Sequence, residues 1–196
     1  MGGGTFDSST YRAAASARAS AGINDFDYDR KVKSGVVSGI HASLDPTAVA
    51  GPTSPFAGKN IRESRDSDEH PNSIPIMAFF DVTGSMHHIP TVLQKKLVTL
   101  MDVIIAKAGI PDPQILVGAI GDSSPSYGRE MTDRYPFQVG QFESDNRFDE
   151  QLRSIILEGG GGGQVMESYG LAYRFAAHHT ATDAWDKRGK KGYLFT

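Results

Sequence analysis

An acidic residue and two hydroxyl residues alternate directly after an apolar run of the chain. The run IPIMAFF ends at Phe80 and is followed by Asp81, Thr83 and Ser85 in the stretch DVTGSM. Side chains at alternate positions of an extended turn point to one side, so these three oxygen-bearing groups are expected to converge. Hard divalent cations prefer oxygen ligands, and the chain has no cysteine to favour a softer metal. The spacing therefore predicts a site for Mg²⁺ or Mn²⁺.

The two hydroxyl groups also suit a purely structural role. The segment from Pro90 has the apolar spacing of a helix, and Thr83 or Ser85 would be suited to cap the free N–H groups that precede it. A single D-x-T-x-S pattern leaves both interpretations open. The strand before the pattern and Gly84 between the hydroxyls favour the metal site.

The elements that must position this site begin at Ile74 and alternate between apolar runs and segments of helical spacing. Their order predicts an α/β fold, with an open, mostly parallel, twisted sheet covered by helices on both faces. Ligands of such sheets bind outside the carboxyl ends of the strands, where Asp81 would lie. In chain order the predicted elements are the strand IPIMAFF, the helix IPTVLQKKLVTLMDVIIAKAG, the strands QILVGAIGD and YPFQVGQF, the helices NRFDEQLRSIILEGG and ESYGLAYRFAAHH, and the strand KKGYLFT.

Residues 1–72 differ in composition from residues 73–196 and are predicted to form an N-terminal arm. The arm is rich in Gly, Ala, Ser and Asp and has only scattered apolar residues. Within it, Tyr11–Ala21 is expected to form a short alanine-rich helix ended by Gly22, and FDYDRK a short strand or a docked turn. We expect the arm to be partly ordered, either wrapping the following domain or forming a flexible tail.

The stretch FFDVTGSM resembles the metal-ion-dependent adhesion site (MIDAS) of von Willebrand factor A (vWA) domains, especially those of bacterial and phage proteins. In that family an apolar strand ends in D-x-[ST]-x-S, and the resemblance covers about residues 74 to 196 of this chain. It implies a vWA-type, Rossmann-like three-layer fold. It also implies that Thr83 and Ser85 coordinate the metal, with Asp81 often acting through water.

The resemblance implies a second ligand loop, which follows a glycine-rich turn and opens a helix. Here that stretch is EGGGGGQVMESYGLAYRFA, and Glu167 or Ser168 stands where the family has a Thr ligand. A Glu at this place would neutralise the ion more strongly than a Thr. Asp122, which ends the second strand in AIGDSS, is expected beside Asp81 across the sheet, either as an additional, indirect ligand or as a turn residue.

The family's third ligand is an Asp just after the fourth strand, which would be GYLFT here, and the sequence ends at Thr196. We therefore expect a domain truncated after its fourth strand. A sheet that ends there would expose a strand edge and uncovered apolar surface.

Composition and resemblance together predict a protein-binding module rather than an enzyme. The formal net charge of -3 and the pI near 6.0 do not indicate a nucleic-acid or membrane partner. Without a signal peptide or an apolar run long enough for a membrane span, the chain is expected to be cytoplasmic.

The resemblance implies that an Asp or Glu of a protein partner completes the coordination of the cation, and by analogy that partner is a MoxR-type AAA+ ATPase. The alternative is a haloacid-dehalogenase-like phosphohydrolase with Asp81 as nucleophile, because a strand ending in D-x-T-G-[ST] resembles that family too.

Overall fold

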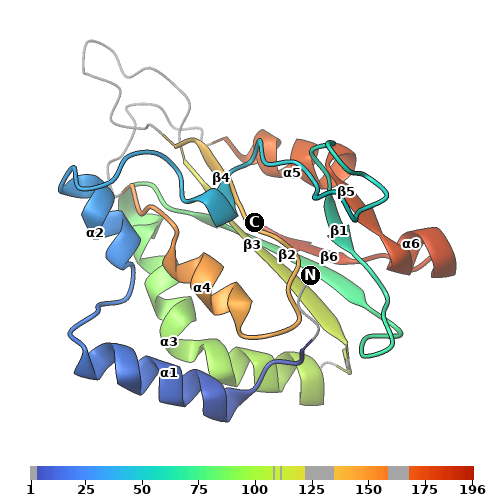
Figure 1. The fold of residues 1–196 in the computed structure, drawn as a ribbon, viewed down its shortest axis with the longest axis horizontal. Helices are drawn as coiled ribbons and strands as arrows, with labels where there is room; N and C mark the ends of the chain where they lie inside the picture. The colour runs from blue at the N-terminus through green and yellow to red at the C-terminus, as the bar shows by residue number, and fades with distance from the viewer. Residues whose placement is uncertain (1–3, 108, 111, 122–134, 159–167) are drawn as a thin grey trace.

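The fold is built on a four-stranded sheet at the centre of the molecule (Figure 1). The computed structural model describes residues 4–107, 109–110, 112–121, 135–158 and 168–196. The strand order is β4-β3-β2-β6, with β6 parallel to β2 and β4 antiparallel to β3. The strands are β2 (Ile74–Asp81), β3 (Pro113–Ile120), β4 (Phe137–Val139) and β6 (Tyr193–Phe195).

The longest pairing joins β2 to β3 in parallel, from Ile74 opposite Pro113 to Asp81 opposite Ile120. A second, two-stranded sheet pairs β1 (Arg62–Ser64) in parallel with β5 (Thr180–Thr182). The predicted α/β class, with a mostly parallel main sheet, is confirmed.

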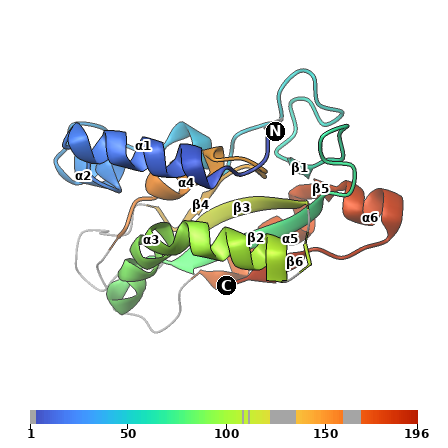
Figure 2. The ribbon, with the colours of Figure 1, turned by 90° about the horizontal axis from the view of Figure 1, so that it is seen from below.

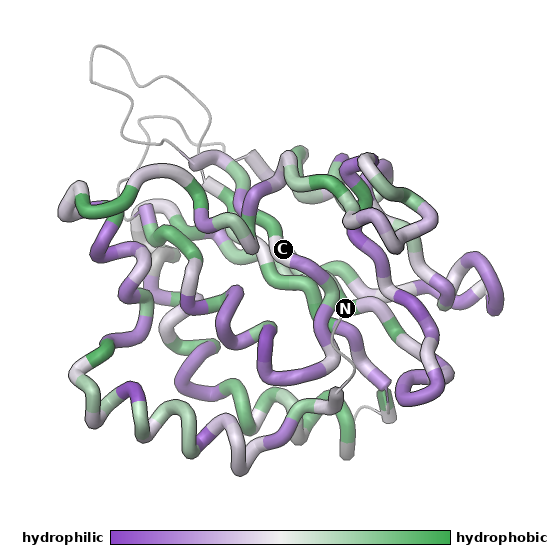
Figure 3. Tube along the Cα trace, in the orientation of Figure 1, coloured by the Kyte–Doolittle hydropathy of each residue, from purple (hydrophilic) through white to green (hydrophobic). Residues whose placement is uncertain are grey.

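Helices cover both faces of the main sheet. One face of β2 and β3 packs in a core with α1 (Ser8–Ser20), α3 (Ile89–Asp102) and α4 (Arg147–Arg153), and the other packs in a core with α5 (Tyr169–His178). In Figures 1 and 2, α1, α3 and α4 gather at one side of the molecule, while α5, β5 and α6 (Asp183–Arg188) gather at the other. Figure 3 shows hydrophobic residues along the central strands and hydrophilic residues along α6. The core is therefore split into two layers by the sheet.

The predicted helix after Asp81 is present as three connected pieces. A 3₁₀ turn, η2 (Gly84–His88), leads into α3, and a π-helical segment, η3 (Val103–Lys107), follows it. Pro90 lies in the first turn of α3, where its missing N–H costs no helical hydrogen bond. Gly109 has a φ of +66°, a backbone conformation that favours glycine. The start and stop signals of this helix were therefore readable in the sequence.

Two predicted elements differ in the structure. FDYDRK is not a strand or a turn but the start of α2 (Asp27–Lys33), in which Asp27 pairs with Arg30 and Lys31 one helical turn away. The helix predicted over NRFDEQLRSIILEGG is shorter in the structure, where α4 spans only Arg147–Arg153.

Tertiary hydrogen bonds replace the helical ones just beyond α4. The Gln138 side chain accepts a hydrogen bond from the Ile156 N–H at 2.9 Å and donates one to the Ile156 carbonyl at 3.0 Å. The Leu157 N–H donates to Asp29 Oδ1 of α2 at 2.9 Å. These bonds satisfy the backbone N–H and C=O groups without a helix. Because they come from residues elsewhere in the chain, the local spacing of apolar residues could not have revealed them.

The described part of the N-terminal arm packs into the core. The Tyr11 hydroxyl donates to the Gln94 carbonyl of α3 at 3.0 Å, and Phe26 and Leu44 are 4% and 0% exposed. Arg62 is 1% exposed and donates to the carbonyls of Asp45, Ala48 and Gly140. Tyr11, Phe26 and Leu44 of the arm are thus core residues.

An apolar groove lies beside β6, the terminal strand of the main sheet. Its volume is about 430 Å³, and its lining includes Ala78, Phe80, Tyr193 and Phe195. Tyr193 and Phe195 are 47% and 58% exposed. The sheet thus exposes apolar surface at this edge. A helix with the length and apolar character needed to cross a membrane is absent from the described residues.

Close packing at Gly118 gives a test of the central sheet. A Cβ at Gly118 would lie 2.5 Å from the Phe79 ring and 2.6 Å from the Gln138 carbonyl, whereas a Cβ at Gly170 in α5 would meet nothing within 4 Å. Gly118→Ala is expected to lower the free energy of unfolding by about 1–3 kcal/mol in urea denaturation. Gly170→Ala is the control, and we expect it to be neutral or to stabilise by up to about 1 kcal/mol. Equal effects of the two substitutions would contradict this packing.

The carboxylate of Asp183 ties α6 to the segment after β1 and gives a test at low pH. Burial opposes its ionisation, but hydrogen bonds from Lys187, the Asp66 amide and Arg65 outweigh that effect and lower the pKa of Asp183 from 3.8 to about 2. A carboxyl group whose pKa is lowered by folding stabilises the fold at any pH above its ordinary, unfolded-state pKa. This stabilisation is lost as the pH falls toward the folded-state pKa.

Asp183→Asn is therefore expected to lower the free energy of unfolding at pH 7 by about 1–2 kcal/mol, after allowance for solvent screening. The difference from the wild type should shrink as the pH falls from about 4 to 2, as followed by urea denaturation at each pH. The exposed Asp68 offers the matched control Asp68→Asn, for which no such difference is expected. A constant difference for Asp183→Asn across this range would be inconsistent with the lowered pKa.

Candidate metal site at the carboxyl end of β2

Asp81 is the last residue of β2, the strand that pairs with both β3 and β6. The chain keeps its pairing for one more step, because the Val82 N–H donates to the Ile120 carbonyl at 3.1 Å and the Val82 side chain is fully buried. The next residue, Thr83, has extended backbone and immediately precedes η2. Asp81 and Thr83 are thus held on either side of a buried anchor.

The side chains of Asp81 and Thr83 meet, as their spacing predicts. Asp81 Oδ1 accepts hydrogen bonds from the Thr83 hydroxyl at 2.6 Å and from the Thr83 N–H at 2.8 Å. Thr83 is 4% exposed. Because the Thr83 hydroxyl gives its only proton to Asp81, any further polar partner of this oxygen must be a proton donor or a cation.

Thr83 occupies the N-cap position of η2, the place that the capping interpretation gives it. Within the described part of the chain, its side chain makes no capping hydrogen bond there. The Met86 N–H is satisfied by the Thr83 carbonyl instead, at 2.9 Å. Ser85 lies inside η2, and its side chain is outside the described part of the chain.

Tyr169 contributes a third contact to the Asp81 carboxylate. It is the first residue of α5, and its hydroxyl donates to Asp81 Oδ2 at 3.2 Å. The preceding Ser168 N–H donates to the carbonyl of Gly121, the residue that follows β3, at 3.2 Å. The start of α5 is thus fastened to the carboxyl ends of β2 and β3.

A second carboxylate lies at this edge of the sheet, on Glu158. A Cβ at Gly121 would lie 2.5 Å from Glu158 Oε2, so the carboxylate sits directly over that glycine. Glu158 Oε1 also accepts a hydrogen bond from the Tyr135 N–H at 3.2 Å. The Glu158 carboxylate can occupy this position because Gly121 has no side chain.

The predicted site residues fall into two groups. The structure brings Asp81 and Thr83 together, and it places Ser168 at the start of α5, the second ligand loop of the prediction. Asp122 and Glu167 lie outside the described residues. Among the residues that the structure does describe, His, Cys, Asp and Glu form no group of three or more that could hold a metal.

Sequence reasoning missed Tyr169 and Glu158. Tyr169 lies within the stretch predicted to carry the second ligand loop, directly after Ser168, and this position was the signal for it. Glu158 was assigned to the end of a helix, and only the early end of α4 places it at the sheet edge.

Comparison of the chain with known proteins found no matching family model, no matching curated protein and no matching solved structure.

The oxygen ligands that Asp81 and Thr83 can offer fit a hard cation. Asp81 supplies one carboxylate, and Thr83 supplies a hydroxyl oxygen whose proton is already directed at that carboxylate. Mg²⁺ and Mn²⁺ accept such oxygen ligands and commonly retain water in the remaining positions. Asp81 and Thr83 would hold the ion, and the ion would supply a positive charge that attracts an anionic group.

The Thr83 hydroxyl can be tested in a pair of variants. Thr83→Val keeps the shape of the side chain but removes the hydrogen bond to Asp81, so the free energy of unfolding is expected to fall by about 1–2 kcal/mol. Thr83→Ser retains a hydroxyl and is expected to cost less. Urea denaturation in a chelating buffer measures both, and a Val variant as stable as the Ser variant would contradict the role of the hydroxyl.

Proposed function

We propose that the chain is a vWA-like module that binds proteins through a divalent cation. Mg²⁺ or Mn²⁺ is held by Asp81, Thr83 and Ser85, with a contribution from Asp122 and from Glu167 or Ser168. The observation that carries this proposal is the bond from the Thr83 hydroxyl to Asp81 Oδ1, at the carboxyl end of a central parallel strand. This bond orients the hydroxyl oxygen as an acceptor, which is the form a metal ligand needs.

The charge of these ligands favours a partner over a reaction. Asp81 is the only charged member of the D-x-T-x-S set, so this set offsets only one of the ion's two positive charges, and the ion attracts a further carboxylate. A partner's Asp or Glu would complete the coordination. Glu158, and Glu167 if it is a ligand, would weaken this attraction by neutralising the ion.

The class of partner follows from the family resemblance. Intracellular vWA proteins act in assemblies, and a MoxR-type AAA+ ATPase is the partner proposed by analogy. A cytoplasmic location accords with that assignment. The parallel main sheet with helices on both faces supports a vWA-type, Rossmann-like architecture for residues 73–196.

The metal site is tested by titrating Mn²⁺ into the full chain and following binding by calorimetry. Asp81→Ala is expected to weaken Mn²⁺ binding on the order of a hundredfold, because it removes the charged group and the acceptor that orients Thr83. Asp68→Ala removes an exposed acid elsewhere in the chain and serves as the control, with unchanged binding expected. If Asp81→Ala and Asp68→Ala bind Mn²⁺ equally well, the proposed site is wrong.

The same variants separate the phosphohydrolase alternative. If Asp81 were a nucleophile, incubation with a generic phosphate ester would form an acyl-phosphate at Asp81 and Asp81→Asn would abolish hydrolysis. The adhesion-type module predicts neither.

A further inference from the structure

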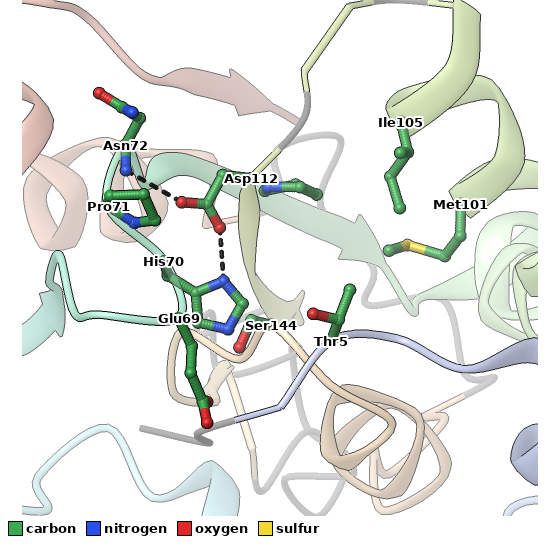
Figure 4. A pocket seen from close by; sticks show the side chains of 10 residues that line it. Thr5, Glu69, His70, Pro71, Asn72, Met101, Ile105, Asp112 and Ser144 are labelled. Atoms are coloured by element: carbon green, nitrogen blue, oxygen red, sulfur yellow. Dashed lines mark hydrogen bonds and ion pairs between the residues drawn. The ribbon is translucent and has the colours of Figure 1, made fainter.

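Residues 4–7, with the sequence Gly-Thr-Phe-Asp, lie in a cleft at the edge of the main sheet opposite Asp81. The segment belongs to no helix or strand. His70 and Asp112, which line the cleft, precede the first residues of β2 and β3, Ile74 and Pro113. The cleft (Figure 4) therefore lies at the opposite end of these strands from the proposed metal site.

Two buried side chains hold the first peptide group of this segment. The Gly4 carbonyl lies 3.0 Å from His70 Nε2 and accepts a hydrogen bond from the Ser144 hydroxyl at 2.7 Å. His70 and Ser144 are 4% and 6% exposed. Because a carbonyl oxygen only accepts, His70 Nε2 carries the proton of its bond.

His70 is itself fixed in place. Its Nδ1 lies 2.5 Å from Asp112 Oδ1, and Asp112 Oδ2 accepts from the Asn72 N–H at 3.1 Å, as the dashed lines of Figure 4 show. The ring orientation is thus set before the Gly4 carbonyl is bound.

The next two residues of the segment differ in burial, because Thr5 is exposed and Phe6 is partly buried. Thr5 lines a cavity of about 240 Å³ together with Met101 and Ile105 of the α3 side. The Phe6 ring packs against the core, with its centroid 5.9 Å from that of Phe148 and 6.0 Å from that of Tyr11. Phe6 is the aromatic anchor of the segment.

The last residue is held through its backbone on both sides. Asn146 Oδ1 accepts from the Asp7 N–H at 3.1 Å, and Asn146 Nδ2 donates to the Asp7 carbonyl at 3.1 Å. The Asp7 carboxylate does not serve the cleft, because it accepts from the Thr10 N–H at 2.6 Å and caps α1. The cleft therefore recognises the main chain at residue 7.

We infer that His70, Ser144, Asn146 and Phe148 form a peptide-recognition cleft, for which Gly4–Asp7 is the ligand within the chain. Side-chain bonds to the peptide backbone at both ends, with one aromatic anchor between them, are the features by which proteins bind extended peptides. Apart from the ring contact of Phe6 with Tyr11 and the cap formed by Asp7, these contacts reach from the segment to parts of the chain other than α1. The same segment from a second copy of this chain therefore fits the cleft.

Disulfide trapping in the cysteine-free chain tests the arrangement. A Cβ at Gly4 would lie 3.5 Å from the Cβ of Asp145, within the range that a disulfide spans. The double variant Gly4→Cys/Asp145→Cys is expected to form one disulfide within the chain under mild oxidation, seen by mass spectrometry. A folded double variant without this disulfide would overturn the placement of the segment.

Recognition of a separate segment is tested with the full chain carrying Phe6→Ala and Asp145→Cys. The probe is a synthetic peptide of residues 1–10 with Gly4→Cys, and the matched peptide also carries Phe6→Ala. The peptide with Phe6 is expected to cross-link about tenfold faster or more, since a buried aromatic anchor contributes at least that factor. Adding Asn146→Ala to the chain should slow the cross-linking of the peptide that carries Phe6.

Equal cross-linking of the two peptides would overturn the inference, because the thiol would then be captured without recognition. If Phe6→Ala prevents folding, as circular dichroism would show, the Asp145→Cys chain with its own Phe6 is used at higher peptide concentration. The chain's own segment then competes, but the preference for the peptide with Phe6 must persist, and its absence is equally decisive.

Discussion

The parallel pairing of β2 with β3 is the constraint on which the rest of the structure depends. Eight residues of each strand lie in register, so the two strands begin together and end together. Their carboxyl ends place Asp81 opposite Ile120, the residue before Gly121, and the segments before their amino ends bring His70 to Asp112. One ladder of backbone hydrogen bonds, which runs as far as Asp81, thus sets both the metal-site edge and the cleft edge of the sheet. Because β2 is paired on both sides, Asp81 cannot shift without loss of sheet hydrogen bonds.

The N-terminal arm takes part in the same construction. Asp29 of α2 accepts from the Leu157 N–H, and Lys33 donates to the Leu157 carbonyl at 2.6 Å. Leu157 is followed by Glu158, the carboxylate that lies over Gly121. The arm therefore helps to place an acidic group at the metal-site edge, while its residues 4–7 lie at the cleft of the other edge. A segment that looked peripheral in composition contacts both ends of the sheet.

Much of the fold followed from local patterns, and the failures have physical causes. The apolar run of β2, the helical spacing of α3 and the alternation of Asp81 and Thr83 each act over a few residues, which is why the sequence revealed them. The early end of α4 depends on Gln138, far along the chain, and the contact of Tyr169 with Asp81 spans 88 residues. The sequence left the packing of the arm open because Tyr11, Phe26 and Leu44 are too widely spaced to form a pattern, yet each fills a core position. Asp122, Glu167 and the side chain of Ser85 lie outside the described residues, so their part in the site stays a prediction.

The central claim is that a divalent cation binds where the Thr83 hydroxyl turns its proton toward Asp81. Crystals of the chain grown with Mn²⁺ test this most directly, because the anomalous scattering of manganese locates the ion without reference to any partner or activity. The account predicts an anomalous peak about 2.0–2.4 Å from the Thr83 and Ser85 hydroxyl oxygens, with Asp81 bound directly or through water. A peak elsewhere, or an Asp81–Thr83 hydrogen bond with no manganese beside it at saturating concentration, would contradict the account.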